Sequence, residues 1–180
     1  MKKIIAIQIM LYLFLVSSHA QDWNVKTSAT LWATATPNIE LGYALNKHVT
    51  LHVPIQYNPF VFGDNSRFQQ LSTMPGARYW FSRSHVGAFI SAYAIVSRFH
   101  VGGWFDQKYR YDGKGFGGGI GAGYSWILTK RLNIECEGGI GLIHADYDKC
   151  GWRKDSRLYA HIKGMRVIPA KLDVSIVYFF

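Results

Sequence analysis

The chain has 180 residues, which suits a single domain, and a net charge of +9. Charged residues make up 17% and aromatic residues 16%, whereas a soluble domain usually carries about 25% charged residues. The 18 glycines follow no G-X-Y period and only 5 prolines occur, which excludes collagen and low-complexity disorder. Two cysteines are too few for a disulfide scaffold.

The N-terminal segment has the features of a Sec-type signal peptide. Two lysines precede an apolar run over 4–16, which is shorter than the roughly 20 residues that a membrane-spanning helix needs. Ser18 and Ala20 place small residues at the −3 and −1 positions of a cleavage site. We therefore expect a signal peptide over 1–20 and one mature domain over 21–180. A short N-terminal core helix is the alternative. Cleavage removes the two lysines and lowers the net charge from +9 to +7.

Apolar residues alternate with polar or small ones along most of the mature chain. In the last segment, one face of an extended strand carries Leu172, Val174, Ile176, Tyr178 and Phe180. Such a period of two predicts β-strands with one apolar face. Pro54 and Pro75 each remove a backbone donor and predict bulges or strand bends. Eight segments follow the pattern: 23–33, 39–45, 49–57, 71–81, 86–96, 116–128, 132–147 and 171–180.

The gaps between these segments alternate in length after the second one. The short gaps are 46–48, 82–85 and 129–131, and the long gaps are 58–70, 97–115 and 148–170. Outer-membrane barrels have short periplasmic turns, longer extracellular loops and an even number of strands from eight upward. The sequence therefore predicts an all-β fold, an eight-stranded antiparallel up-and-down transmembrane β-barrel, with the three long gaps as outer loops.

Charged residues at mid-strand indicate which face points inward. Lys26, Arg78, Glu135, Glu137 and Asp173 occupy the polar faces of their strands. In lipid these side chains must point into the barrel, where they can pair. We expect an interior charge cluster in the periplasmic half, with Arg78 at its centre and Glu135 or Glu137 as its partner. A proton or ion path through these groups is the functional alternative.

A soluble barrel of the lipocalin kind also alternates, but with its apolar face inward. Aromatic residues near strand ends favour the membrane, because aromatic girdles flank the apolar band of a membrane barrel. The inward glycines over 117–123 make room for bulky side chains of facing strands, or else line a small ligand cavity. The expected girdles comprise Trp23, Tyr79, Trp126 and Tyr178 on the periplasmic side and Tyr57, Phe116 and Tyr147 on the outer side.

Most of the positive charge falls in two of the expected loops. On an outer surface these cations suit contact with outer-membrane lipid and the phosphates of lipopolysaccharide, and solvated loops are the alternative. Nucleic acid is a poor partner for an exported barrel. The basic residues singled out are Arg98, Lys108, Arg110, Lys149, Arg153, Lys154 and Arg157.

No catalytic or metal-binding motif occurs. Neither G-x-S-x-G nor H-E-x-x-H is present, and the spacing of His144, Asp146 and His161 is not diagnostic of a metal site. We expect no enzyme activity, no cofactor and no metal. An outer-rim enzyme that modifies lipid or peptide, or a narrow porin-like transport or ligand barrel, is the alternative. The residues available to a rim enzyme are His100, His144, Asp146, Asp148, Ser156 and His161.

Several stretches resemble a family of small outer-membrane β-barrels of unknown function that is common in Bacteroidetes. The resemblance implies the eight-stranded barrel and an outer-membrane location after Sec export, but no activity. Members can occur near fimbrial gene sets, which hints at surface adhesion or assembly. The matching stretches are TATPNIELG (34–42), YNPFVFGDN (57–65), PGARYWF (75–81), GAGYSWILTKRLNIECEGGIG (121–141), DYDKCG (146–151) and the last strand.

The chain departs from the family in two places. Members commonly carry Glu where Gly76 stands, so Arg78 needs a partner from another strand. Many members have a cysteine pair in the last loop, where only Cys150 remains. Cys136 lies more than ten residues away on a strand, beyond the roughly 6 Å between Cα atoms that a disulfide needs, so we expect free thiols or an intermolecular bond through Cys150.

The final strand resembles the C-terminal signal read by the barrel-assembly machinery, through Ile176, Tyr178 and Phe180. That machinery is the implied partner during biogenesis, and Phe180 as a rim aromatic is the compatible structural role. The leading hypothesis is a non-enzymatic outer-membrane barrel with an envelope structural or surface-interaction role. Its surface partner is not specified by the sequence.

Overall fold

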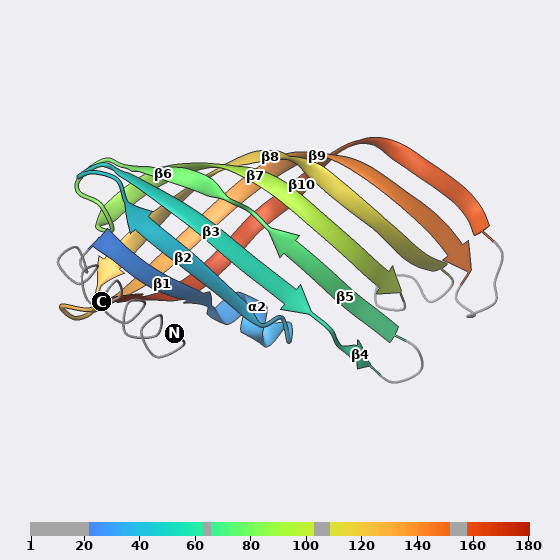
Figure 1. Cartoon of the computed structure of the whole chain (residues 1–180), viewed down its shortest axis with the longest axis horizontal. Coiled ribbons are helices and arrows are strands. Elements are labelled where there is room, and N and C mark those ends of the chain that lie inside the picture. The colour runs from blue at the N-terminus through green and yellow to red at the C-terminus, as the bar shows by residue number, and fades with distance from the viewer. Residues whose placement is uncertain (1–21, 63–65, 103–108, 152–157) are drawn as a thin grey trace, which may run out of the picture.

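The computed structural model describes residues 22–62, 66–102, 109–151 and 158–180. The expected signal peptide lies outside these residues. The described chain forms an antiparallel sheet that closes on itself (Figure 1). Its elements are β1 (Trp23–Ser28), α2 (Ala29–Ala33), β2 (Asn38–Ala44), β3 (Val49–Asn58), β4 (Val61–Phe62), β5 (Ser66–Thr73), β6 (Gly76–Trp80), β7 (Gly87–Gly102), β8 (Tyr109–Ile127), β9 (Leu132–Gly151) and β10 (Leu158–Phe179).

The ten strands occupy eight positions around the barrel. β5 and β6 share one position, because both pair with β3 on one side and with β7 on the other. β4 follows β3 in the chain and pairs with the far end of β5. The sheet closes because β1 pairs with both β10 and β2, and β2 pairs in turn with β3. The fold is therefore the all-β, antiparallel, eight-stranded closed barrel that the alternation predicts.

Two prolines lie where one strand position is interrupted. The β3–β6 ladder ends at the pair His52–Gly76, and the β3–β5 ladder begins at the pair Ile55–Thr73. Pro54 and Pro75 fall in the gap between these ladders, so neither removes a hydrogen bond from them. The Thr73 hydroxyl donates to the Pro54 carbonyl at 2.7 Å and ties the two sides together. The irregularity expected at these prolines is therefore a gap between the β3–β6 and β3–β5 ladders.

The strands differ greatly in length. β1 and β2 have 6 and 7 residues, whereas β8, β9 and β10 have 19, 20 and 22. Figure 1 shows the wall formed by β7 to β10 continuing well past the level of α2, where β1 and β2 meet.

The expectation of three long loops is therefore wrong, because most of 58–70, 97–115 and 148–170 is strand. Apolar alternation fades in these extensions because polar side chains occupy both faces, but the backbone ladder continues. The segments between the strand ends are 63–65, 103–108 and 152–157, which lie outside the described residues.

The first expected strand, 23–33, is also too long. β1 ends at Ser28, whose hydroxyl accepts the backbone N–H of Leu31 at 3.2 Å and caps α2. A serine before a short helical turn is a common N-cap, since it satisfies an N–H that has no partner within the helix. Strand and helix cannot be separated by periodicity over so few residues. No described helix is long and apolar enough to cross a membrane.

The faces of the barrel are reversed relative to a water-soluble protein. Arg78 and Glu135 are buried in the bore at 4% and 1% exposure, whereas Ile176 is 49% exposed on the outer wall. The same alternation runs along β3, where Thr50 and His52 are buried and Leu51 and Val53 are exposed. Apolar side chains therefore cover the exterior and ionisable ones line the bore, which is the arrangement that the mid-strand charges predict.

Candidate functional site

The bore contains a network of ion pairs around Arg78 of β6. One terminal nitrogen of Arg78 lies 2.7 Å from a carboxylate oxygen of Glu40 on β2. The other lies 2.9 Å from Glu137 on β9. All three side chains are buried, and together they connect strands from opposite parts of the sheet. Arg78 thus pairs with carboxylates on other strands, as expected for a chain with glycine at position 76.

Glu137 has more partners than Arg78. Its carboxylate also lies 3.0 Å from the Lys171 ammonium and 3.7 Å from Lys26, and it accepts the Ser91 hydroxyl at 2.7 Å. A carboxylate surrounded by donors in this way is well compensated for burial. Glu137 therefore makes three ion pairs, and Arg78, the expected centre, makes two, one of them with Glu137 as expected.

Lys26 of β1 carries the second half of the network. Its ammonium lies 3.2 Å from Glu135 and 3.1 Å from Asp173. Glu135 therefore pairs with Lys26, whereas the carboxylates bound to Arg78 are Glu40 and Glu137. The structure thus brings together all four residues singled out as an interior cluster, and the described ion pairs set three cations against four carboxylates.

Sequence reasoning missed Glu40, Lys171 and His52. Glu40 could have been found, since it alternates with Ile39 and Leu41, which are exposed. Lys171 lies beside an irregularity in the β9–β10 register between Pro169 and Lys171, which changes the parity of the inward face. His52 is buried, and its ring lies 3.4 Å from the Lys171 ammonium.

Next to this network, on the side away from the short turns, apolar side chains fill the bore. Met74, Tyr93 and Ile95 are buried together, and Ile143 and Ala170 pack against them. The glycines of β8 and β9 make room for them: a Cβ at Gly119 would come 2.5 Å from the Tyr93 ring, and one at Gly141 would come 2.6 Å from Ile95. The glycine stripe therefore accommodates bulky side chains.

The short-turn end of the bore is closed by aromatic rings. Trp80 and Phe89 are buried with ring centroids 4.5 Å apart, and the His85 ring lies 4.9 Å from the Phe179 ring. The His85 backbone carbonyl accepts the Asn133 amide at 2.7 Å, which anchors the turn. Burial, reinforced by the charge of Arg78, lowers the pKa of the His85 imidazole to about 4.

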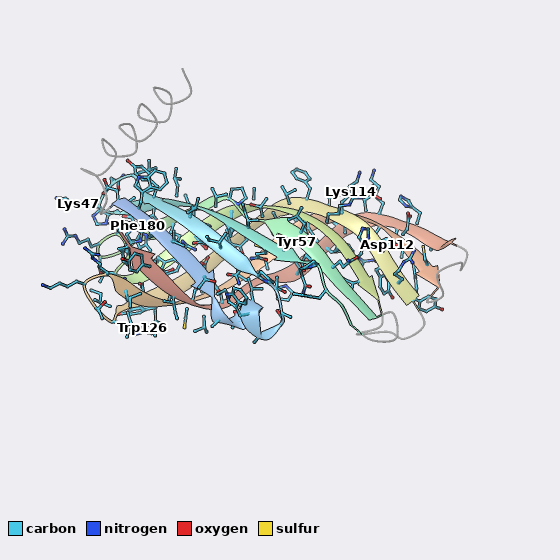
Figure 2. The ribbon with its side chains drawn as sticks, turned by 60° about the horizontal axis from the view of Figure 1, so that its bottom comes forward. Lys47, Tyr57, Asp112, Lys114, Trp126 and Phe180 are labelled. Atoms are coloured by element: carbon cyan, nitrogen blue, oxygen red, sulfur yellow. The ribbon has the colours of Figure 1, made fainter. Side chains whose placement is uncertain are left out.

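The outer wall has an apolar belt. Along β8 the exposed positions Trp126, Tyr124, Ile120 and Phe116 alternate with inward residues, and Lys114 follows as the first charged one. Figure 2 shows Trp126 and Phe180 toward the end with the short turns, and Lys114 and Asp112 toward the opposite end. The expected girdle aromatics Trp23, Tyr57, Tyr79 and Tyr178 are exposed. The expectation is wrong for Tyr147, which is half-buried on the same face of β9 as the inward residues Ile143 and Ala145. Ile176, Tyr178 and Phe180, the expected assembly signal, point outward.

The basic residues expected in loops lie on strands where they are described. Arg98 is exposed on β7. Arg110 of β8 donates to the Asp112 carboxylate at 2.8 Å, and the Lys149 ammonium lies 3.7 Å from the centre of the Tyr109 ring. The remaining four, Lys108, Arg153, Lys154 and Arg157, lie outside the described residues.

Two histidines make three contacts with aspartates on the outer wall. The His161 ring nitrogens lie 2.7 Å from Asp148 and 3.3 Å from Asp146, and His100 lies 3.0 Å from Asp112. Asp146 thus contacts His161 across strands. Ser156, the candidate nucleophile, lies outside the described residues. In the described ranges no three His, Cys, Asp or Glu side chains are grouped to hold a metal ion.

Both cysteines have free thiols and lie on β9. Cys136 pairs in register with Tyr124 and Val174 of the apolar belt. Cys150 pairs with Arg110, near the far end of the extended wall. The two thiols therefore lie at different heights along the barrel, Cys136 within the apolar belt and Cys150 beyond it.

Fold and site together define a closed eight-stranded β-barrel with an ionised, filled bore and an apolar exterior. A family model described as a protein of unknown function (DUF3575) matches residues 6–180. The chain therefore belongs to the DUF3575 family. The comparisons with curated proteins and with solved structures each found no match.

Proposed function

We propose that the protein is a non-enzymatic outer-membrane β-barrel with a structural or surface-interaction role in the cell envelope. The observation that carries the proposal is the reversal of its faces, with apolar side chains outside and paired charges inside. Exposing such a belt to water would be unfavourable, whereas a bilayer accommodates it. Closure satisfies the backbone groups that no lipid could hydrogen-bond.

The height of the apolar belt supports this location. Trp126 and Phe116 are the first and last aromatics on the outward face of β8. Ten residue steps of about 3.3 Å, tilted by roughly 40°, cover about 25 Å. This equals the apolar band of outer-membrane barrels, which is about 25 Å tall and flanked by aromatic girdles. The belt ends at Lys114, where charged side chains begin.

The orientation follows from the two ends of the barrel. Short turns characterise the periplasmic end of outer-membrane barrels, so the extended wall of β7 to β10 would stand on the cell-surface side. The expected signal peptide and the Phe180 terminus support Sec export and insertion by the barrel-assembly machinery. Outer-membrane lipid, lipopolysaccharide or a fimbrial surface component would then contact the extended wall.

The filled bore supports a structural or binding role over transport. The apolar cluster around Tyr93 lies directly above the charge network, and eight-stranded barrels generally have interiors filled by side chains. The alternative that a specific contact favours is a rim enzyme, since His161 touches two carboxylates. A hydrolytic activity toward lipid or peptide that His161→Ala abolishes would support this alternative.

The location is tested by the chain's own cysteines. The full chain is expressed in a Gram-negative host and its membranes are fractionated. We expect the protein in the outer membrane, with faster gel migration before boiling than after. A membrane-impermeant maleimide on intact cells should label Cys150 and not Cys136.

Cys150→Ser should abolish the labelling, and Cys136→Ser, the matched control, should leave it unchanged. Recovery in the soluble fraction, with one mobility in the gel, would exclude the proposal. Labelling of Cys150 only after the outer membrane is permeabilised, and of neither cysteine on intact cells, would reverse the orientation.

A further inference from the structure

A row of cations crosses the outer wall just beyond the apolar belt. Arg98 of β7 pairs in register with Lys114 of β8, Lys114 with Asp146 of β9, and Asp146 with Lys163 of β10. Residues directly opposite each other in an antiparallel sheet project from the same face. Three cations and one carboxylate therefore stand side by side across four strands, over roughly 14 Å at about 4.8 Å per strand.

The single carboxylate in this row does not neutralise the cations. Asp146 lies 3.3 Å from the Nε2 atom of His161, and it has no ion pair with Lys114 or Lys163 among the described contacts. Arg98, Lys114 and Lys163 are exposed, and none lies within ion-pair distance of a described carboxylate. The row therefore has an uncompensated positive charge, unlike the bore.

The cation row borders a groove in the outer wall. The groove has a volume of about 760 Å³. Its apolar floor contains Val53, Ile55, Leu71, Val96 and Phe116, all of them exposed. Arg98, Lys114 and Lys163 also line it, so the positive charge stands along the same hollow as the apolar surface. Figure 2 shows Lys114 on the outer side of the wall, in the half away from Lys47.

We infer that this groove binds one lipid A molecule of the outer leaflet, with its acyl chains on the apolar floor and its phosphates on Arg98, Lys114 and Lys163. The inference rests on the proposed outer-membrane location and specifies the partner. Charge complementarity supports this occupant: phosphate is the anionic group that an amphiphile carries at the boundary of the hydrocarbon, and lysine and arginine bind it. A headgroup with two phosphates can use a row of this length.

The experiment compares lipids that differ only in phosphate. The mature chain is refolded in neutral detergent and delipidated, and native mass spectrometry measures its binding of bis-phosphorylated lipid A, of the same lipid after removal of both phosphates, and of a zwitterionic phospholipid. We expect binding of one lipid A and at least tenfold weaker binding of the other two. Arg98→Gln with Lys114→Gln should weaken lipid A binding roughly 30-fold, because each cation near an anionic lipid surface is worth about a factor of five.

The matched control removes two exposed cations from the short turns, by Lys47→Gln with Lys130→Gln, and should change lipid A binding less than twofold. Equal binding of all three lipids would overturn the inference. The inference would also be overturned if the two double variants weakened lipid A binding equally, or if neither of them weakened it. If one of these results is obtained and the chain still fractionates with the outer membrane, only the assignment of lipid A as the ligand is wrong. If the chain is recovered as a soluble protein, the proposed function is wrong as well.

Discussion

The bore and the outer wall both carry positive charge, but in opposite settings. Arg78 in the bore is buried and has two carboxylate partners, whereas Arg98 and Lys114 on the wall are exposed without one. Buried charges must be paired, because an unpaired ion inside a protein is costly. Exposed cations impose no such requirement, so their alignment in one row beside an apolar groove needs another explanation. We therefore expect the bore charges to stabilise the barrel and propose that the wall cations bind a ligand.

The strongest test of this contrast is removal of Arg78. Arg78→Met would leave Glu40 and Glu137 buried with fewer partners and should destabilise the barrel by about 3–5 kcal/mol. Urea unfolding in phospholipid vesicles, followed by tryptophan fluorescence, measures the change. The matched control Arg98→Met should change stability by less than about 0.5 kcal/mol. Equal effects of the two substitutions would show that the bore network does not hold the barrel together.

A charge on the apolar belt tests what surrounds the wall. Ile120 is exposed midway between Trp126 and Lys114 on β8. In a bilayer, Ile120→Arg should cost about 2–4 kcal/mol, and Leu128→Arg, at the short-turn rim, about 0–1 kcal/mol. The same unfolding assay compares them. A water-facing wall would tolerate both substitutions alike, and that result would contradict the membrane assignment.

Acid should weaken the closed, short-turn end. The pKa of His85 is about 4 in the folded chain against 6.5 normally, so the unfolded chain binds more protons between these values. The contribution of neutral His85 is complete above about pH 6.5 and is lost progressively as the pH falls toward 4, up to about 3 kcal/mol. Comparing unfolding at pH 7.5 and pH 4.5 for wild type and His85→Gln checks this. An identical acid loss in both proteins would assign it to other groups.

The smallest expected effect concerns the glycines that line the bore. Gly119→Ala should cost about 1–3 kcal/mol, because its Cβ would meet the Tyr93 ring and the Ile140 carbonyl at 2.5 and 2.6 Å. Gly138→Ala is the control, since a Cβ there has nothing within 4 Å. Unfolding midpoints in urea separate the two. If Gly138→Ala proved the more damaging, the crowding around Tyr93 would not explain the glycine stripe.

Alternation could be read from the sequence wherever one face is apolar. The belt residues of β8 and the end of β10 follow a strict period of two, so their strands and their faces were predictable. The predicted strand boundaries were wrong where the two faces of a strand no longer differ in polarity. Around Asp112 and Lys149 polar side chains stand on both faces, and the strands continue through backbone pairing that periodicity does not reveal.

The interior residues Lys26, Arg78, Glu135 and Glu137 were predictable as a group, because a charge at mid-strand in an apolar pattern has to face inward. Their pairing was not predictable. Whether Arg78 meets Glu135 or Glu137 depends on register, closure and the distance across the bore. Lys171 shares the inward face with Asp173 and Ser175, so alternation gives its direction correctly. It was left out of the cluster because it is the first residue of the expected last strand, 171–180, and not a charge at mid-strand.

By itself, the sequence determined a closed antiparallel barrel and the parity of most side chains, since a period of two is a local property of each strand. Only the tertiary structure decided that Glu137 makes ion pairs with three cations in the bore and that Tyr93 fills the space left by glycines. It also decided that Arg98, Lys114 and Lys163 form one row. Those relations join residues far apart in the chain. They arise from the register between neighbouring strands and from closure of the sheet, which no single segment encodes.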